Sequence, residues 1–291
     1  MWQLFLINFI IIAFAIGFLI LSKKFIKDDK QVRIFFLVLP LLTIACHYSS
    51  LIYHGIKDGT AMGFLESNPN LVLMIYPCNV VMWILFILGV FWKYRDKRAF
   101  KVIIDFSFYF GIISALVGMF ANVDFIRNPT LADYDVTKGI VAHGFMLMNV
   151  IALGFYKIVK IDMIPNFINL TIGVVAMGIL GAYNNLLLAV VAGDAYADSV
   201  NSMFLLHSPF ENVPFLVFPI IVLIALPIYF GIFEIIDLIA YKNCLAKMNI
   251  RIKQAENELD EFIRENSKTM NQDEFKVLLK EKEANLKDEI A

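Results

Sequence analysis

Residues 2–22 read WQLFLINFIIIAFAIGFLILS, an apolar run that contains no charged side chain. A helix needs about 20 mostly apolar residues to cross the hydrocarbon core of a bilayer. Similar runs recur at 32–54, 71–92, 101–122, 137–158, 165–192 and 214–240. They show no apolar/polar alternation, and a backbone in lipid must satisfy its own hydrogen bonds, so we expect helices rather than strands. The sequence predicts an all-α, polytopic membrane protein with seven transmembrane helices.

The composition of the chain agrees with this prediction. Hydrophobic residues make up 59% of the 291 residues, charged residues make up 18%, and the mean hydropathy is +0.71. A soluble domain has roughly a quarter charged residues. No basic residue precedes the first run, and its apolar character continues beyond Ala15, so we expect a membrane helix rather than a cleaved signal peptide. The cysteines Cys46, Cys78 and Cys244 provide no disulfide framework.

Basic residues gather in alternate connections between the runs. The connections after the first, third, fifth and seventh runs contain Lys23, Lys24, Lys27, Lys30, Arg33, Lys93, Arg95, Lys97, Arg98, Lys101, Lys157, Lys160, Lys242 and Lys247. The other connections are poor in basic residues, with Lys57, Arg127 and Lys138. Positive charge stays on the cytoplasmic side of a membrane. We therefore predict an outside N-terminus, a cytoplasmic C-terminus and a multi-pass location in the plasma membrane.

The chain is predicted to divide into a transmembrane domain, residues 1–241, and a cytoplasmic helical tail, residues 242–291. Apolar residues in the tail step by three and four, as in a short coiled coil, at Leu245, Met248, Ile252, Ala255, Leu259 and Phe262. Asn271 is typical of a helix N-cap and predicts a second helix. The tail is either a hairpin folded on itself or a surface for self-association or a cytoplasmic partner. We expect no nucleic-acid partner.

Polar side chains gather at one predicted depth of the transmembrane domain. Such side chains are costly in lipid and usually face the interior of a helix bundle. The depth of a residue in the bilayer follows from its distance to the predicted end of its helix, at about 1.5 Å per residue. By this measure seven polar residues lie in the outer third of the bilayer: Asn8, His47, Cys78, Ser114, His143, Asn184 and Asn185. Each residue alone is explained by packing or by a hydrogen bond between helices. Their common depth predicts a polar cavity.

Cys78 follows a proline at which the chain either kinks or begins a new helix. The residue before a proline, Tyr76, is biased away from helix, and Pro77 suits the first position of a helix. A restart would leave Cys78 in the first helical turn. There the helix dipole and the free N–H groups favour a thiolate and can bind an oxyanion.

Several short motifs resemble those of a known family. They are Tyr76-Pro77-Cys78-Asn79, Ala142-His143-Gly144, Asn201-Ser202-Met203-Phe204-Leu205 and Ser208-Pro209. Together they are similar to motifs of the bacterial YwaF membrane proteins and of a related eukaryotic family of cysteine-dependent phospholipid acyltransferases. The resemblance spans residues 35–240 and excludes the tail. It implies that Cys78 is a nucleophile and that His143 is its partner.

The first functional hypothesis is acyl transfer on membrane lipid. Cys78 attacks a phospholipid ester, and a lysophospholipid or another acceptor then takes the acyl group from the thioester. His143 is the general base, because thiol nucleophiles need a neighbouring base, and its ring should lie within about 5 Å of the Cys78 sulfur. No cofactor or metal is expected. The residues expected to bind or orient the substrate are His47, Asn79, Ser114, Asn185 and Asn201.

The second hypothesis is a membrane protein that binds or transports a small solute or ion in the polar layer. Neither a pair of half-helices nor an inverted repeat is evident, which counts against a secondary transporter. A metal site of Cys46, His47, Cys78 and His143 is a weaker alternative, because neighbouring residues diverge by about 100° on a helix. A purely structural scaffold is the remaining alternative.

Overall fold

The computed structural model describes residues 2–57, 59, 61–120, 130–208, 218–266 and 271–290. The described residues are largely helical, and no strand occurs among them. The chain divides into two compact units, Met1–Ile228 and Tyr229–Ala291. Outside the described residues lie Arg127, the motif residue Pro209, the end of the fourth apolar run, 121–122, and the beginning of the last, 214–217.

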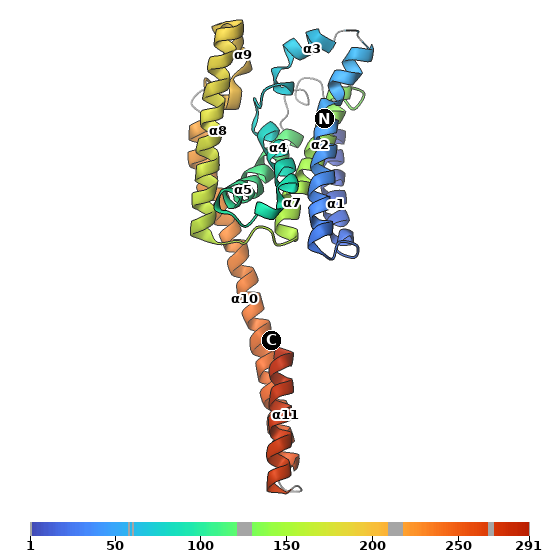
Figure 1. Ribbon diagram of the computed structural model, residues 1–291, viewed down its shortest axis with the longest axis vertical. Coiled ribbons are helices and arrows are strands. Elements are labelled where there is room, and N and C mark those ends of the chain that lie inside the picture. The colour runs from blue at the N-terminus through green and yellow to red at the C-terminus, as the bar shows by residue number, and fades with distance from the viewer. Residues whose placement is uncertain are drawn as a thin grey trace. The chain divides into compact units, whose positions relative to one another are not determined.

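Among the described residues, the first unit contains six main helices besides the beginning of α10 (Phe218–Asn266). They are α1 (Trp2–Ser22), α2 (Asp29–Lys57), α4 (Pro77–Val90), α5 (Arg98–Phe120), α7 (Tyr134–Phe155) and α8 (Met163–Ala192). Short elements between them are α3 (Ala61–Ser67), η1 (Pro69–Leu71), η2 (Trp92–Tyr94), α9 (Asp194–Val200) and η3 (Ser202–Phe204). Figure 1 shows α4, α5 and α7 between α1 and α2 on one side and α8 on the other. α7 is central, because it packs against α1, α2 and α5.

Five helices of the described chain are long and apolar enough to cross a membrane: Gln3–Ser22, Asp29–Lys57, Arg98–Phe120, Tyr134–Phe155 and Ile164–Ala192. They match the first, second, fourth, fifth and sixth predicted runs to within a few residues. α1 and α8 turn large apolar side chains outward, among them Phe9, Phe14, Ile179, Leu186 and Val190. Apolar faces of this extent are exceptional on a soluble protein and suit contact with lipid.

The third apolar run forms a helix over only part of its length. The apolar run over 71–92 was expected either to kink or to begin a new helix at Pro77, and α4 has 14 residues and begins at Pro77. The helix alone covers about 21 Å at 1.5 Å per residue, which is less than the roughly 30 Å of a hydrocarbon core. The physical reason is the proline, which forces the preceding residue out of the helical region.

The last apolar run and the first part of the tail form one helix, α10 (Phe218–Asn266). The predicted boundary at 241/242 falls inside this helix, and the boundary between the two compact units lies in the sequence at 228/229. In the second unit, α10 pairs with α11 (Gln272–Ile290): the rings of Phe262 and Phe275 stack with centroids 6.4 Å apart, and Lys282 pairs with Glu258 at 3.3 Å. The predicted helix after Asn271 is confirmed.

Candidate functional site

A break in the chain places Cys78 at the start of α4. Tyr76 has extended backbone angles (φ −112°, ψ 155°), and Pro77 is the first helical residue. The Tyr76 N–H donates to the Asn79 side chain at 3.2 Å, and the Asn79 N–H donates to the Tyr76 carbonyl at 3.0 Å. These reciprocal bonds close the first turn. The restart before Cys78 is therefore confirmed, and the free, partly buried thiol lies in that turn.

The non-helical backbone before α4 is held by three side chains that we call the amide cluster: Asn184, Asn185 and Ser202. The Asn184 amide donates to the Met74 carbonyl at 3.0 Å, and the Ser202 hydroxyl donates to the Ile75 carbonyl at 3.1 Å. Asn185 pairs with both backbone groups of Ser202, at 2.7 and 3.2 Å. Irregular backbone at membrane depth needs such partners. The amide cluster therefore allows α4 to begin inside the bundle.

His47 reaches the same turn from α2. The Asn79 side-chain amide donates to His47 Nε2 at 3.3 Å. Asn79 is 3% exposed and uses both ends of its amide. Two of the predicted substrate-binding residues therefore lie together: Asn79 in the turn that contains Cys78, and His47 beside that turn on α2.

His143 is held against α5. Its Nδ1 bonds the Gly139 carbonyl at 2.7 Å, and because a carbonyl only accepts, the proton lies on Nδ1 and the lone pair on Nε2. A Cβ at Gly118 would lie 2.1 Å from Nε2, so only glycine leaves room for the ring there. Ser114, one turn earlier on α5, is partly buried. The pairing of Cys78 with His143 stays a prediction.

Asn201 stabilises the loop that follows α9. Its backbone is left-handed (φ 46°, ψ 61°) and its side chain is 4% exposed. The Asn201 amide donates to the His207 carbonyl at 2.7 Å and accepts from the Leu206 N–H at 2.9 Å. Met203 and Phe204 also have positive φ, a strained conformation that persists only where surrounding contacts enforce it. The side chains of Asn201 and Asn185 therefore hydrogen-bond the loop that follows α9 and stabilise its conformation.

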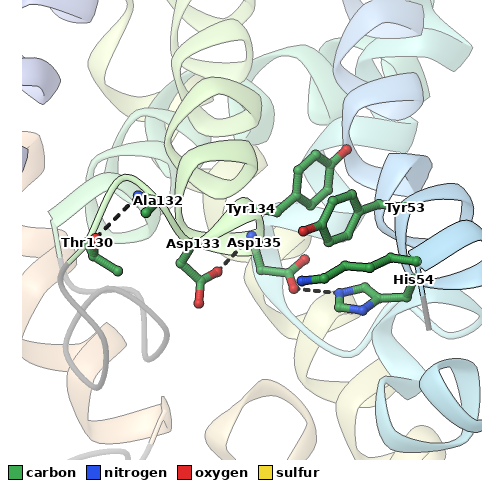
Figure 2. A pocket seen from close by; sticks show the side chains of 8 residues that line it. Tyr53, His54, Thr130, Ala132, Asp133, Tyr134 and Asp135 are labelled. Atoms are coloured by element: carbon green, nitrogen blue, oxygen red, sulfur yellow. Dashed lines mark hydrogen bonds and ion pairs between the residues drawn. The ribbon is translucent and has the colours of Figure 1, made fainter.

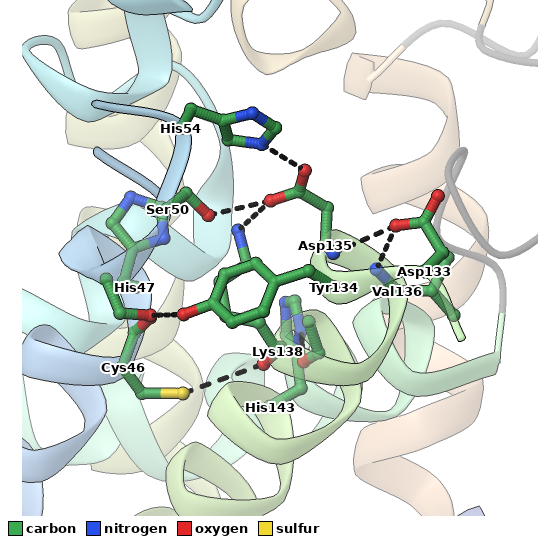
Figure 3. A network of polar contacts seen from close by, with 12 residues as sticks. Cys46, His47, Ser50, His54, Asp133, Tyr134, Asp135, Val136, Lys138 and His143 are labelled. Carbon is green, nitrogen blue, oxygen red and sulfur yellow. Dashed lines mark hydrogen bonds and ion pairs between the residues drawn. The ribbon is translucent and has the colours of Figure 1, made fainter. Parts of the chain in front are cut away.

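Four residues that sequence reasoning did not place in the site form a charged cluster: Ser50, His54, Asp135 and Lys138 (Figure 3). The Asp135 carboxylate accepts from the Ser50 hydroxyl at 2.7 Å and contacts His54 Nε2 at 2.8 Å. Lys138 Nζ lies 3.5 Å from the same carboxylate. The cluster joins the end of α2 to the start of α7.

Weak sequence signals pointed to this cluster. His54 follows His47 by seven residues, which is two helical turns, so both histidines lie on one face of α2. Asp135 and Lys138 are three apart and therefore also share a face. The predicted run started at 137, which left Asp135 outside it and placed Lys138 at its very beginning, where it was counted with the basic residues of the neighbouring connection.

A pocket of about 350 Å³ opens beside the charged cluster (Figure 2). It is lined by Tyr53, His54, Lys57, Thr130, Ala132, Asp133, Tyr134 and Asp135. The rings of Tyr53 and Tyr134 stack with centroids 4.0 Å apart, and Tyr134 donates to Ser49 at 2.7 Å. The pocket therefore combines an aromatic wall with carboxylate, imidazole and ammonium groups.

Lys138 links the charged cluster to the predicted polar layer. Its backbone carbonyl accepts from the Cys46 thiol at 3.7 Å. Its ammonium is near enough to act electrostatically on Cys78, His47 and His143. Cys46 thus faces α7 while His47 contacts α4, so these neighbours diverge as expected on a helix. Among the described residues, no group of three or more His, Cys, Asp or Glu side chains could hold a metal ion.

No protein-family model, curated protein or solved structure matches this chain.

Proposed function

We propose that this protein is a membrane-embedded acyltransferase that acts on phospholipids, with Cys78 as nucleophile and His143 as general base. The observation that carries the proposal is the restart of α4 at Pro77. It leaves a thiol in the first turn of a half-helix, where N–H groups and the helix dipole favour negative charge. Half-helices whose N-termini face the substrate occur inside the bundles of secondary transporters, and we propose that the first turn of α4 faces the lipid ester in the same way.

The reaction proceeds in two steps through a thioester. His143 Nε2 takes the Cys78 proton while the sulfur attacks the ester carbonyl of the donor phospholipid, so that a C–S bond forms. The ester C–O bond then breaks, and the lysophospholipid oxygen leaves with the proton from His143. In the second step an acceptor hydroxyl gives its proton to His143 and attacks the thioester. The C–S bond breaks, the acyl group is transferred, and Cys78 regains its proton.

Neighbouring side chains have distinct proposed roles in this reaction. Because His47 accepts from the Asn79 amide, we assign these two residues to orienting the donor lipid rather than to proton transfer. Ser114 would contact the acyl chain from α5. Asn185 and Asn201 are committed to backbone groups of Ser202 and His207, so they would act by shaping the wall of the site.

The topology that suits this function has seven spans, with the N-terminus outside and the C-terminus in the cytoplasm, in the plasma membrane. Five apolar helices support it, together with the short α4 and the apolar beginning of α10. The clustering of basic residues supports the orientation. We further propose membership of the YwaF-like family, lipids or lysolipids as partners, and self-association or a cytoplasmic partner through α11 and the end of α10.

A second candidate function is the binding or transport of a small solute or ion. The charged cluster and its pocket of about 350 Å³ favour it, because intramembrane ionisable residues often mark solute or proton paths. In this case Asp135 and Lys138 would be essential and Cys78 dispensable.

Purified protein in liposomes with defined donor and acceptor lipids tests the enzyme proposal. We expect Cys78→Ala to abolish transfer and to remove a lipid-derived thioester detectable by mass spectrometry. Cys46→Ala is the matched control, since Cys46 is also a free, partly buried thiol near Lys138, and it should keep activity within about twofold, as expected for a residue outside the chemistry. Full transfer by folded Cys78→Ala protein would end the proposal.

A further inference from the structure

The pocket of about 350 Å³ beside the charged cluster opens where α2 ends and α7 begins. Both helices are long and apolar enough to cross a membrane, so these ends lie at a membrane surface, on the side that the topology predicts to be outer. Ligand pockets measure about 300–1,000 Å³. A pocket at the lower end of this range holds a small polar ligand or the headgroup of a lipid, but not a whole lipid.

The pocket lies further out than the two histidines of the predicted polar layer. On α2, His54 follows His47 by seven residues, and on α7, Asp135 precedes His143 by eight. At about 1.5 Å per residue these intervals are about 10 and 12 Å. The headgroup region on each side of the hydrocarbon core is roughly 5–8 Å thick. A phospholipid whose ester lies at the level of the two histidines therefore extends its headgroup toward the pocket.

Asp133 presents a fixed carboxylate to the pocket. It is the N-cap of α7, and its Oδ1 accepts from the N–H groups of Asp135 and Val136 at 2.9 and 3.3 Å. These bonds hold the side chain against the first turn. A carboxylate has about four acceptor positions, so it can also accept a hydrogen bond from a ligand. Figure 2 shows Asp133 on one side of Asp135 and His54 on the other.

Lys57 supplies the opposite charge beside the aromatic wall. Its Nζ lies 5.1 Å from the centroid of the Tyr53 ring. That ring stacks on Tyr134 with only 8° between the two planes. A cation over a tyrosine ring is a favourable contact, so the wall already accommodates one ammonium group. Tyr134 is also the neighbour of Asp133 in the chain, which places aromatic and acidic groups together.

The charges that line the pocket do not favour a ligand of a single sign. The Asp135 carboxylate is already bonded to the other members of the charged cluster. Asp133 and Lys57 are the other two residues of opposite charge that line the pocket. A simple anion is attracted by Lys57 and repelled by Asp133, and a simple cation the reverse. A ligand that has both charges a few bonds apart meets both residues favourably.

We propose that this pocket binds a zwitterionic phosphodiester, with the phosphate at Lys57 and the ammonium between Asp133 and the tyrosine wall. Two sources offer this chemistry: the headgroup of a zwitterionic phospholipid and a water-soluble glycerophosphodiester. The inference deepens the proposed acyl transfer by naming the headgroup class that the protein recognises, and its link to the donor lipid rests on that proposal.

The test measures lipid retention by full-length protein in an uncharged detergent, using native mass spectrometry and no acyl acceptor. The probes are phosphatidylcholine and phosphatidylglycerol with identical acyl chains, which share the phosphodiester and differ in the ammonium group. We expect phosphatidylcholine to be retained about fivefold better, the size of a partly exposed charge contact. Glycerophosphocholine as a soluble competitor distinguishes the sources. If it displaces the lipid, the pocket also accepts the free solute, and if it does not, the site is one for lipid; both results support the zwitterion site.

Two variants test the charges separately. Asp133→Asn removes the negative charge but keeps a good N-cap, and it should abolish the preference for phosphatidylcholine. Lys57→Gln changes an exposed residue at the end of α2, and it should weaken the retention of both lipids, since both lose the partner of their phosphate. Glu66→Gln is the matched control, because it removes an exposed carboxylate of the adjacent α3 that does not line the pocket. It should leave the preference unchanged.

Equal retention of the two lipids by the unaltered protein overturns the inference. So does a loss of preference in Glu66→Gln as large as that in Asp133→Asn, which would assign the preference to overall charge. If Asp133→Asn fails to fold, Lys57→Gln still decides, because unchanged retention of both lipids in that variant contradicts the proposed phosphate contact. The measurement involves no acyl transfer, so its failure is distinguishable from retained activity in Cys78→Ala.

Discussion

The amide cluster and the charged cluster are both polar groups inside an apolar bundle, but they satisfy their hydrogen bonds in different ways. Asn184, Asn185 and Ser202 are neutral, are 6% exposed or less, and bond mostly to backbone groups. Asp135 and Lys138 are charged, bond to other side chains, and are 25% and 17% exposed. A neutral group tied to backbone has one stable arrangement. A charged group tied to a titratable neighbour can exchange protons or ligands.

We infer from this difference that the amide cluster maintains the backbone structure and that the charged cluster takes part in proton exchange or ligand binding. The amide cluster fixes the backbone from which α4 starts, so its loss should damage the fold. The charged cluster lines a pocket and acts on the thiol and the histidines through Lys138, so its loss should change pH dependence and binding more than stability.

The largest effect is expected from Asn185→Leu. The substitution leaves the buried Ser202 N–H unpaired, at about 1–3 kcal/mol for an unsatisfied group, and leaves the Ser202 carbonyl with only the longer 3.4 Å bond from the Leu205 N–H. We expect the free energy of unfolding to fall by about 2–4 kcal/mol, measured by denaturant titration in detergent. Thr171→Val is the control on the same helix, because the exposed Thr171 hydroxyl donates to the Phe167 carbonyl of its own helix. If both variants unfold alike, the amide cluster is not what supports the start of α4.

A smaller effect on stability is expected from Asp135→Asn. The change leaves Lys138 and His54 without their carboxylate, but these groups are partly exposed, so the cost should be about 1–2 kcal/mol rather than the 3–5 kcal/mol of a fully buried pair. A double-mutant cycle with His54→Gln measures the coupling across the 2.8 Å contact. If Asp135→Asn lowered the stability more than Asn185→Leu, the charged cluster rather than the amide cluster would be the region that maintains the fold.

The smallest effect concerns the loop beside the amide cluster. Hydrogen bonds to the carbonyls of Asp198 and Ser208 raise the pKa of His207 above its usual value of about 6.5. Because the folded pKa is the higher one, the protonated ring stabilises the loop fully below pH about 6.5, and this is lost as pH rises through the raised pKa. Hydrogen exchange of residues 193–208, corrected for intrinsic rates, should therefore be slower at pH 6 than at pH 8. His207→Gln should remove the difference, and an equal difference in that variant would assign it to another group.

The sequence predicted more of the fold than of the site. Apolar runs place five spans within a few residues, because lipid imposes a minimum length on each helix. Pro77 predicts the break before Cys78, because its effect on Tyr76 is local. The pairing of Asn185 with Ser202 was not predictable, since it depends on the left-handed backbone at Asn201 that turns the loop back onto α8.

The charged cluster was missed for a different reason. Asp135 lies in the first turn of α7, and hydropathy alone starts that helix later. Only the docking of α2 on α7 reveals that its carboxylate faces Ser50 and His54. The sequence around a polar residue at a helix end is the same whether that residue faces water or a neighbouring helix, so the sequence does not distinguish the two cases.

The partners that complete the start of α4 are far away in the order of synthesis. The Met74 carbonyl accepts from Asn184, which is synthesised 110 residues later, and the Ile75 carbonyl accepts from Ser202, which is synthesised 127 residues later. At about 5–20 residues per second, translation needs about 6–25 s to cover the longer interval. During that time the carbonyls before α4 lack the side chains that bind them in the finished protein. The setting of the Cys78 thiol is therefore assembled late in biosynthesis, when most of the bundle has already left the ribosome.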